Sequence, residues 1–179
     1  MKRIWKITTI AFVLLLLDFG LTTYYLLNYG DIVSEGNVVF NNSQYGYLVF
    51  PLNIIYLVMI FIASKIYCRY KTVVIESMGT LNYIKRLYTS NHSLFIIVSL
   101  CFTFIVASFV SRFTAILDWV VFGIYKENFF NTQYAIIRST MPMERYDVVT
   151  GIIAGLVAIP LWFHIEYLKS KKVLQQKNS

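Results

Sequence analysis

Four long apolar segments dominate this sequence and restrict the folds that it can adopt. They cover residues 7–27, 47–66, 94–111 and 148–168, and the third has the least definite end. Each is close to the roughly 20 residues that a helix needs to cross about 30 Å of hydrocarbon. Because lipid offers no partners to backbone polar groups, such segments must form helices or a closed barrel, and unbroken apolar runs do not fit barrel strands. The sequence therefore predicts an all-α integral membrane bundle of four helices.

The composition of the whole chain agrees with this class. Of its 179 residues, 58% are hydrophobic and only 14% are charged, and the mean hydropathy is +0.61. We predict one membrane domain over residues 1–179, because the linkers at 28–46, 67–93 and 112–147 are too short or too polar to fold alone. No catalytic motif, cofactor fingerprint or metal-ligand spacing accompanies the apolar segments, so the residues favour a protein that is not an enzyme and indicate no cofactor or metal.

The basic residues indicate the orientation of the predicted helices. Twelve of the 16 lysines and arginines lie before the first helix, between the second and third, or after the fourth. By the positive-inside rule, both termini and residues 67–93 face the cytoplasm, and residues 28–46 and 112–147 lie outside the cell membrane. The net charge of +7 is therefore a topology signal. It favours contact with anionic lipid headgroups on the cytoplasmic side over binding to nucleic acid.

Two linkers carry predictions of their own. Within residues 67–93, the stretch VVIESMGTLNYIKRLY fits a short amphipathic helix on the membrane surface, with its basic residues toward the headgroups. A single helix over residues 94–125 would be about 48 Å long, which exceeds the bilayer core. Either this helix projects beyond the membrane or residues 113–125 form an interfacial or re-entrant piece. We favour the second alternative, with a break near residues 112–115.

Asp18 places a carboxylate in the middle of the first apolar segment. At 1.5 Å per residue it lies about 16 Å from the start of that segment, near the membrane midplane, where an unpaired charge is costly. Asp18 should therefore face the bundle and be either protonated or paired. Thr22 at i+4 and Tyr25 at i+7 extend a polar stripe along the same helical face.

Two carboxylates, Asp18 and Glu35, are equally good candidate partners for Arg112. Arg112 is the only basic residue on another helix that could reach the stripe, but it lies about 10 Å nearer the outside, so direct contact requires a helix tilt or a bridging water. Glu35 lies in the linker 28–46. Two interpretations stay open: a charged relay or ligand site of Asp18, Glu35 and Arg112, or a polar network that packs the helices.

The last apolar segment carries two further features. Gly151 and Gly155 form a G-x-x-x-G motif, which permits the close approach of another helix from the same chain or from another subunit. His164 and Glu166 lie two residues apart, so their side chains lie on different helical faces and do not form a metal-binding pair. We expect both to extend toward the membrane interface.

The first helix and its following loop resemble part of a known family. The residues that carry the match are Leu17, Asp18, Thr22, Thr23, Leu27, Gly30, Glu35 and Asn37. They resemble the L-D-x-x-x-T-T…G…E-x-N pattern of small prokaryotic, largely archaeal membrane proteins of unknown function. The match covers about a third of the chain, the interval from glycine to glutamate is longer here, and Val38 stands where that family often has proline. The resemblance implies a polar cluster that includes Asn37, and it implies no activity.

Two functions remain compatible with the sequence. It favours a small polytopic membrane protein that acts as a non-catalytic subunit, or as an assembly or stabilising partner, of a larger membrane complex. Four helices bury little surface alone, and the G-x-x-x-G motif favours helix partners, either other membrane subunits or a second copy of the chain. The alternative is an intramembrane transporter or enzyme that uses Asp18, Glu35 and Arg112.

Overall fold

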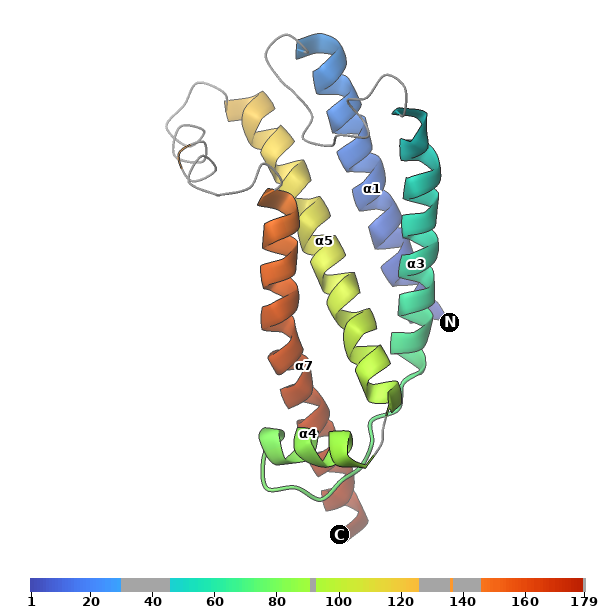
Figure 1. Cartoon of the computed structure of the whole chain (residues 1–179), viewed down its shortest axis with the longest axis vertical. Helices are drawn as coiled ribbons and strands as arrows, with labels where there is room; N and C mark the ends of the chain where they lie inside the picture. Colours follow the sequence, from blue (N-terminus) through green and yellow to red (C-terminus); the bar gives the residue numbers. More distant parts are fainter. Residues whose placement is uncertain (30–45, 91–92, 126–135, 137–145, 179) are drawn as a thin grey trace.

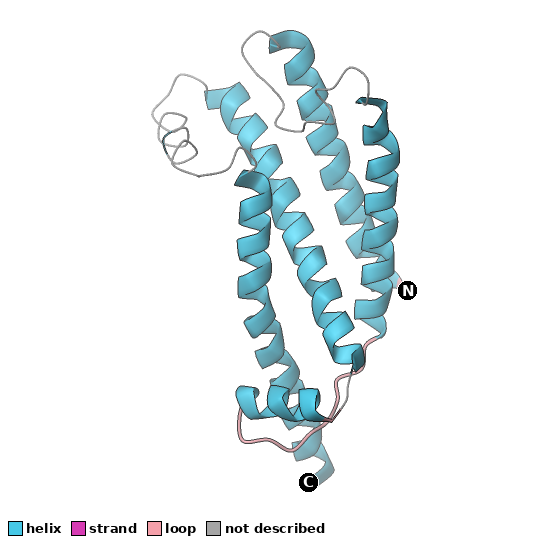
Figure 2. Ribbon diagram, in the orientation of Figure 1, coloured by secondary structure: helices cyan, strands magenta, loops and turns pink. Residues whose placement is uncertain are grey.

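The computed structural model describes residues 1–29, 46–90, 93–125, 136 and 146–178. The elements along the chain are α1 (Lys2–Tyr29), the 3-10 helix η1 (Gly46–Leu48), α3 (Val49–Arg69), α4 (Thr80–Thr89), α5 (Ser93–Tyr125) and α7 (Tyr146–Asn178). The described ranges contain helices and connections but no strand (Figure 2). The predicted all-α class is therefore confirmed.

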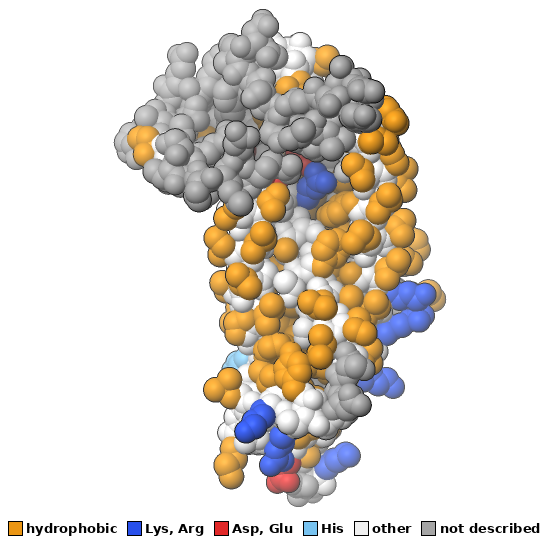
Figure 3. Space-filling model, viewed as in Figure 1, with side chains coloured by type: hydrophobic (Ala, Val, Ile, Leu, Met, Phe, Trp, Pro, Cys, Tyr) orange, Lys and Arg blue, Asp and Glu red, His pale blue; other side chains and the backbone are white. Residues whose placement is uncertain are grey.

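Four of these helices are long and apolar enough to cross a membrane. The candidate spans are Lys2–Asn28, Gly46–Arg69, Leu94–Val121 and Asp147–Lys177. They include the four predicted segments and extend beyond them, so the chain is a small multi-pass membrane protein. In Figure 1, α1 begins and α3 ends toward the lower end of the bundle, and α5 and α7 run in opposite directions. In Figure 3 hydrophobic side chains cover the middle of the visible face, and most of its basic side chains lie toward the lower end.

The helix α5 occupies the centre of the arrangement. Extended helix contacts join α5 to α1, to α3 and to α7, and α1 also packs against α3. Figure 1 shows α7 on one side of α5 and the pair α1 and α3 on the other. The bundle is therefore a group of three helices, α1, α3 and α5, with α7 attached along one side of α5.

Two glycines allow α7 to lie close to α5. A Cβ atom on Gly151 would lie only 2.6 Å from the backbone oxygen of Ala107, and one on Gly155 would lie 2.9 Å from Cγ2 of Thr103. No side chain larger than hydrogen fits these two positions without a shift of the neighbouring helix. The G-x-x-x-G motif of the sequence therefore lies at a contact within the chain.

The predicted break near residues 112–115 does not occur. A single helix, α5, continues from Ser93 to Tyr125, so residues 113–125 extend the third span and form no separate interfacial or re-entrant piece. Neighbouring helices support this extension: Thr150 on α7 donates a hydrogen bond to the Thr114 hydroxyl at 3.2 Å. A tilted helix can also exceed the bilayer thickness without breaking. Sequence length alone therefore gave the wrong boundary for the linker 112–147.

The amphipathic helix predicted in the linker 67–93 is present as α4. Its apolar face packs against the bundle, and its position at the membrane surface stays a prediction. Tyr83 and Leu87 are fully buried in a cluster with Phe95, Val98 and Trp162. The α4 helix thus closes the lower end of the bundle, where it contacts α7.

Candidate functional site

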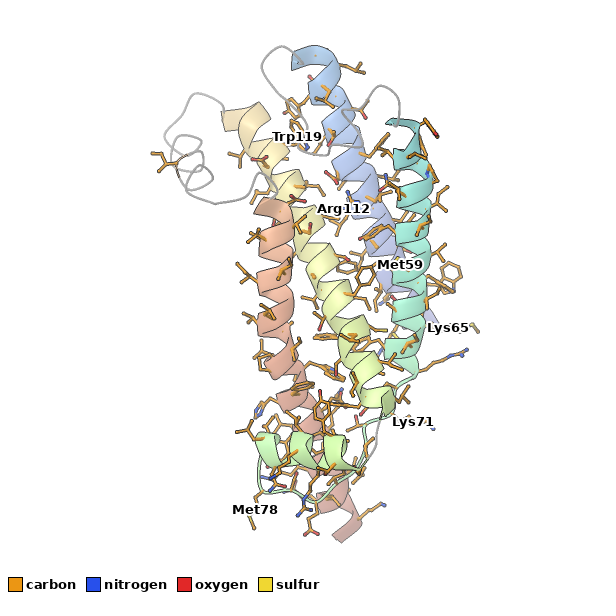
Figure 4. The ribbon with its side chains drawn as sticks, in the orientation of Figure 1. Met59, Lys65, Lys71, Met78, Arg112 and Trp119 are labelled. Carbon is orange, nitrogen blue, oxygen red and sulfur yellow. The ribbon has the colours of Figure 1, made fainter. Side chains whose placement is uncertain are left out.

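An ion pair between α1 and α5 forms the centre of the first polar cluster. Nη1 of Arg112 donates a short hydrogen bond to the carboxylate of Asp18, and Nη2 lies 3.3 Å from Oδ1 of Asn53 on α3. The guanidinium carbon also lies 5.1 Å from the ring centroid of Tyr56, within the range of a cation–π contact. One arginine thereby links three helices. We call Asp18, Asn53, Tyr56 and Arg112 the Asp18 cluster; Figure 4 shows Arg112 in the upper half of α5.

The polar stripe of α1 faces the interior of the bundle. Asp18, Thr22 and Tyr25 are all buried, in line with their positions at i, i+4 and i+7 on one helical face. The ring of Tyr25 stacks on Trp119 of α5, with centroids 5.2 Å apart and an interplanar angle of 8°. The stripe thus continues from the ion pair into an aromatic contact nearer the upper end.

Asp18 and Arg112 contact each other directly, although the sequence left open whether a water bridges them. The packing of α1 against α5 brings the two side chains to the same level of the bundle.

The structure does not place Glu35, Asn37 or two hydroxyls of α5 in the Asp18 cluster. Glu35 and Asn37 lie outside the described residues. Ser99 and Thr103 on α5 donate hydrogen bonds to the carbonyls of Phe95 and Ser99, four residues earlier in their own helix, at 2.8 and 2.9 Å. These two hydroxyls therefore have helix-backbone partners and do not bind the ion pair.

The ion pair is buried incompletely. The side chain of Asp18 is 11% exposed and that of Arg112 is 29% exposed. Pairing offsets part of the cost of placing each charge at membrane depth, and the contact with Asn53 adds a further acceptor for the guanidinium. Chemically, the cluster offers a neutralised carboxylate, a guanidinium and an amide. Within the part of the chain that the structure describes, no group of three or more His, Cys, Asp or Glu side chains could hold a metal ion.

A second polar cluster lies at the lower end and was not foreseen from the sequence. Glu166 is only 2% exposed, so the expectation that it extends toward the membrane interface is wrong. Its carboxylate accepts hydrogen bonds from the Thr72 hydroxyl at 2.6 Å and from the Lys169 ammonium at 2.7 Å. We call Thr72, Glu166, Lys169 and Ser170 the Glu166 cluster.

The Glu166 cluster fastens the connection between α3 and α4 onto α7. The hydroxyl of Ser170 accepts the backbone N–H of Ile75 at 2.9 Å and lies 3.2 Å from the carbonyl oxygen of the same residue. Nearby, Nδ1 of His164 lies 2.8 Å from the hydroxyl of Thr80, the first residue of α4. Backbone and side-chain groups of residues 70–80 thus find their partners on α7.

Burial also affects the tyrosines at this end of the bundle. The pKa of Tyr70 is raised to about 12, chiefly because burial disfavours the phenolate, with a smaller contribution from the negative charge of Glu166. Burial likewise raises the pKa of Tyr83, whose hydroxyl donates a hydrogen bond to the carbonyl of Val73 at 2.8 Å. Both phenols therefore stay neutral at physiological pH.

A signal for the Glu166 cluster was present in the sequence. Trp162, Glu166 and Ser170 are spaced four residues apart, and all three are buried on one face of α7. This spacing predicts a helical face that points into the bundle. It does not predict the partners of that face, because Thr72 and Ile75 lie in a connection without regular secondary structure.

Comparison with known proteins identifies no relative: no family model, no curated protein and no solved structure matches the chain. Membership of the family that the residues around Asp18 resemble therefore stays a prediction.

Proposed function

We propose that the protein is a non-catalytic subunit, or an assembly and stabilising partner, of a larger membrane complex. The observation that carries this proposal is the one-sided attachment of α7. Among the long helices, α7 has its extended contact with α5, and its outer face is apolar. The hydrophobic side chains of this face that are more than half exposed are Ile152, Ile153, Leu156, Val157 and Leu161. We call these five residues the α7 outer face.

The partners of the intramembrane charges support a structural role. Asp18 on α1 pairs with Arg112 on α5, and Glu166 on α7 binds Thr72 and Lys169. Each carboxylate therefore joins two segments of the chain that lie far apart in the sequence. Charges used in this way stabilise one arrangement of helices, which a scaffold or subunit needs.

Site-specific photo-crosslinking in native membranes tests this proposal. A photoreactive amino acid at Ile153 or Leu156 should give crosslinked products of discrete mass, whose size separates a second copy of this chain from a different subunit. Leu16 and Leu17 on α1, which are about half exposed, provide matched positions on another helix, and fully buried Ile60 should crosslink only within the chain. If both α7 positions yield monomer alone, the proposal is wrong.

The partial exposure of the ion pair favours a second candidate function. A guanidinium that is 29% exposed remains accessible to a solute or to a proton carrier, as a transporter or enzyme that uses Asp18, Glu35 and Arg112 would require. An Asp18→Asn protein that folds normally in proteoliposomes but loses a solute or proton flux of the wild type would support this function. A variant that loses only thermal stability would contradict it.

A further inference from the structure

A pocket of about 380 Å³ opens at the lower end of the bundle, beside the Glu166 cluster. Its walls come from three places that are distant in the sequence: the start of α1, the end of α3 with the connection that follows, and the lower part of α7. Three basic side chains, Arg3, Lys6 and Lys169, line it. Its volume lies within the range of pockets that bind small ligands.

The charges in this pocket are predominantly positive. Among its described lining residues the one acidic side chain is Glu166, whose two oxygens already bind Thr72 and Lys169. The Lys169 side chain is 53% exposed, so its ammonium can donate further hydrogen bonds. Arg3 and Lys6 are exposed on the first two turns of α1, and no described residue forms an ion pair with either of them. An anion in the pocket would therefore meet two uncompensated positive charges.

The remaining lining residues suit a ligand at the border between lipid and water. Tyr67 and Tyr70 bring phenols to the wall, and Ile7 brings an apolar side chain. Trp5, which lies between Arg3 and Lys6 in the sequence, is exposed and contacts Phe61 with ring centroids 5.9 Å apart. Tryptophan and tyrosine at such a border are typical of the headgroup region of a membrane.

We propose that this pocket binds the headgroup of an anionic phospholipid, with Arg3 and Lys6 binding its phosphate. A lipid fits better than a soluble anion because the apolar outer surface of α1 continues from the pocket toward the membrane centre. Ile10, Val13 and Leu17 are about half exposed there and offer a path for the acyl chains. The bound lipid would join α1 to α7, two helices that lie on opposite sides of α5.

The two cysteines of the chain allow a direct test. Cys68 lines the pocket and Cys101 lies within α5; both are free thiols. In a Cys101→Ser background, Cys68 is the one remaining thiol, and its rate of reaction with uncharged N-ethylmaleimide reports occupancy of the pocket. The rate is measured in vesicles of phosphatidylcholine alone and in vesicles with equal parts of phosphatidylglycerol and phosphatidylcholine. Phosphatidylglycerol should slow the reaction on the order of tenfold.

Two double variants separate a specific site from general surface charge. Arg3→Gln/Lys6→Gln should abolish the slowing by phosphatidylglycerol. Lys171→Gln/Lys172→Gln removes the same charge from exposed positions of α7 outside this pocket and should retain the slowing. Thermal unfolding of each protein in detergent checks that both variants fold, since neither pair forms an ion pair with a described residue.

Three results would overturn the proposal. Equal reaction rates in the two kinds of vesicle would show that the headgroup does not occupy the pocket. Slowing that persists in Arg3→Gln/Lys6→Gln would show that these two residues do not bind it. Inorganic phosphate could also slow the reaction of Cys68 in the detergent-solubilised protein as strongly as phosphatidylglycerol does. That result would show that the ligand is a soluble phosphate and not a lipid.

Discussion

Arg112 on α5 binds Asp18 on α1 inside a bundle of apolar helices, across 94 residues of sequence. This contact explains how the first apolar segment can contain a carboxylate, because the guanidinium of the central helix offsets its charge. Because the same guanidinium also contacts Asn53 and Tyr56 on α3, the ion pair fixes three helices relative to one another.

Removing one member of this pair should destabilise the bundle more than removing both. Asp18→Asn leaves the Arg112 charge without its counter-ion and should lower the free energy of unfolding by about 3 kcal/mol. The double variant Asp18→Asn/Arg112→Gln should recover part of that loss, which gives a coupling energy of about 1–3 kcal/mol. The free energy of unfolding in mixed detergent micelles is measured for the wild type, Asp18→Asn, Arg112→Gln and the double variant. Additive losses would show that the two side chains do not stabilise each other.

Alanine at two glycines should have opposite effects. Gly151→Ala places a Cβ atom 2.6 Å from the backbone oxygen of Ala107, so α7 must shift away from α5, at a cost of about 1–3 kcal/mol. Gly20, in the middle of α1, has no neighbouring atom within 4 Å of an added Cβ, and Gly20→Ala should stabilise the helix by up to about 1 kcal/mol. Thermal unfolding in detergent compares the two. A neutral Gly151→Ala would mean that α7 and α5 are not closely packed in solution.

The apolar face of α4 should contribute to stability, and its opposite face should not. Leu87 is fully buried, whereas Leu81, on the same short helix, is 85% exposed. Leu87→Ala should lower the free energy of unfolding by about 2–5 kcal/mol, and Leu81→Ala should change it by less than about 0.5 kcal/mol. Equal effects would show that Leu87 is not buried against the bundle.

Strong alkali should weaken the lower end of the bundle through Tyr70. The folded protein raises the pKa of this phenol to about 12, mainly by burial, whereas an unfolded tyrosine ionises near pH 10. The folded state holds the proton more tightly, so this stabilisation is complete below about pH 10 and is lost as the pH rises toward 12.

The variant Tyr70→Phe should therefore reduce the loss of stability between about pH 10 and pH 12. A smaller loss should persist, because burial also raises the pKa of Tyr83. Chemical denaturation over this pH range gives the slope of the free energy of unfolding against pH. Tyr88→Phe, at a half-exposed position of α4, is the control. A Tyr70→Phe protein with the wild-type slope would show that Tyr70 is not buried in its neutral form.

Residue chemistry and segment length were enough to predict the class of the protein and the number of its spans. Long apolar segments admit few alternatives to membrane helices, because backbone groups in lipid must bond within their own helix. Because a charge that faces lipid is costly, the sequence also predicted that Asp18 faces the bundle. The i+4 and i+7 spacing predicted that Thr22 and Tyr25 lie on the same face of the helix. These inferences depend on local chemistry and helical geometry alone.

The contacts between side chains of different helices could not be predicted in this way, because they depend on how the helices pack. Asp18 and Glu35 were equivalent candidate partners for Arg112 until the packing of α1 against α5 brought Asp18 into contact with it. Glu166 resembled an interfacial residue because one sequence does not show that the connection before α4 folds back to supply Thr72. Partner choice depends on contacts between segments distant in the chain, and neither composition nor periodicity encodes those contacts.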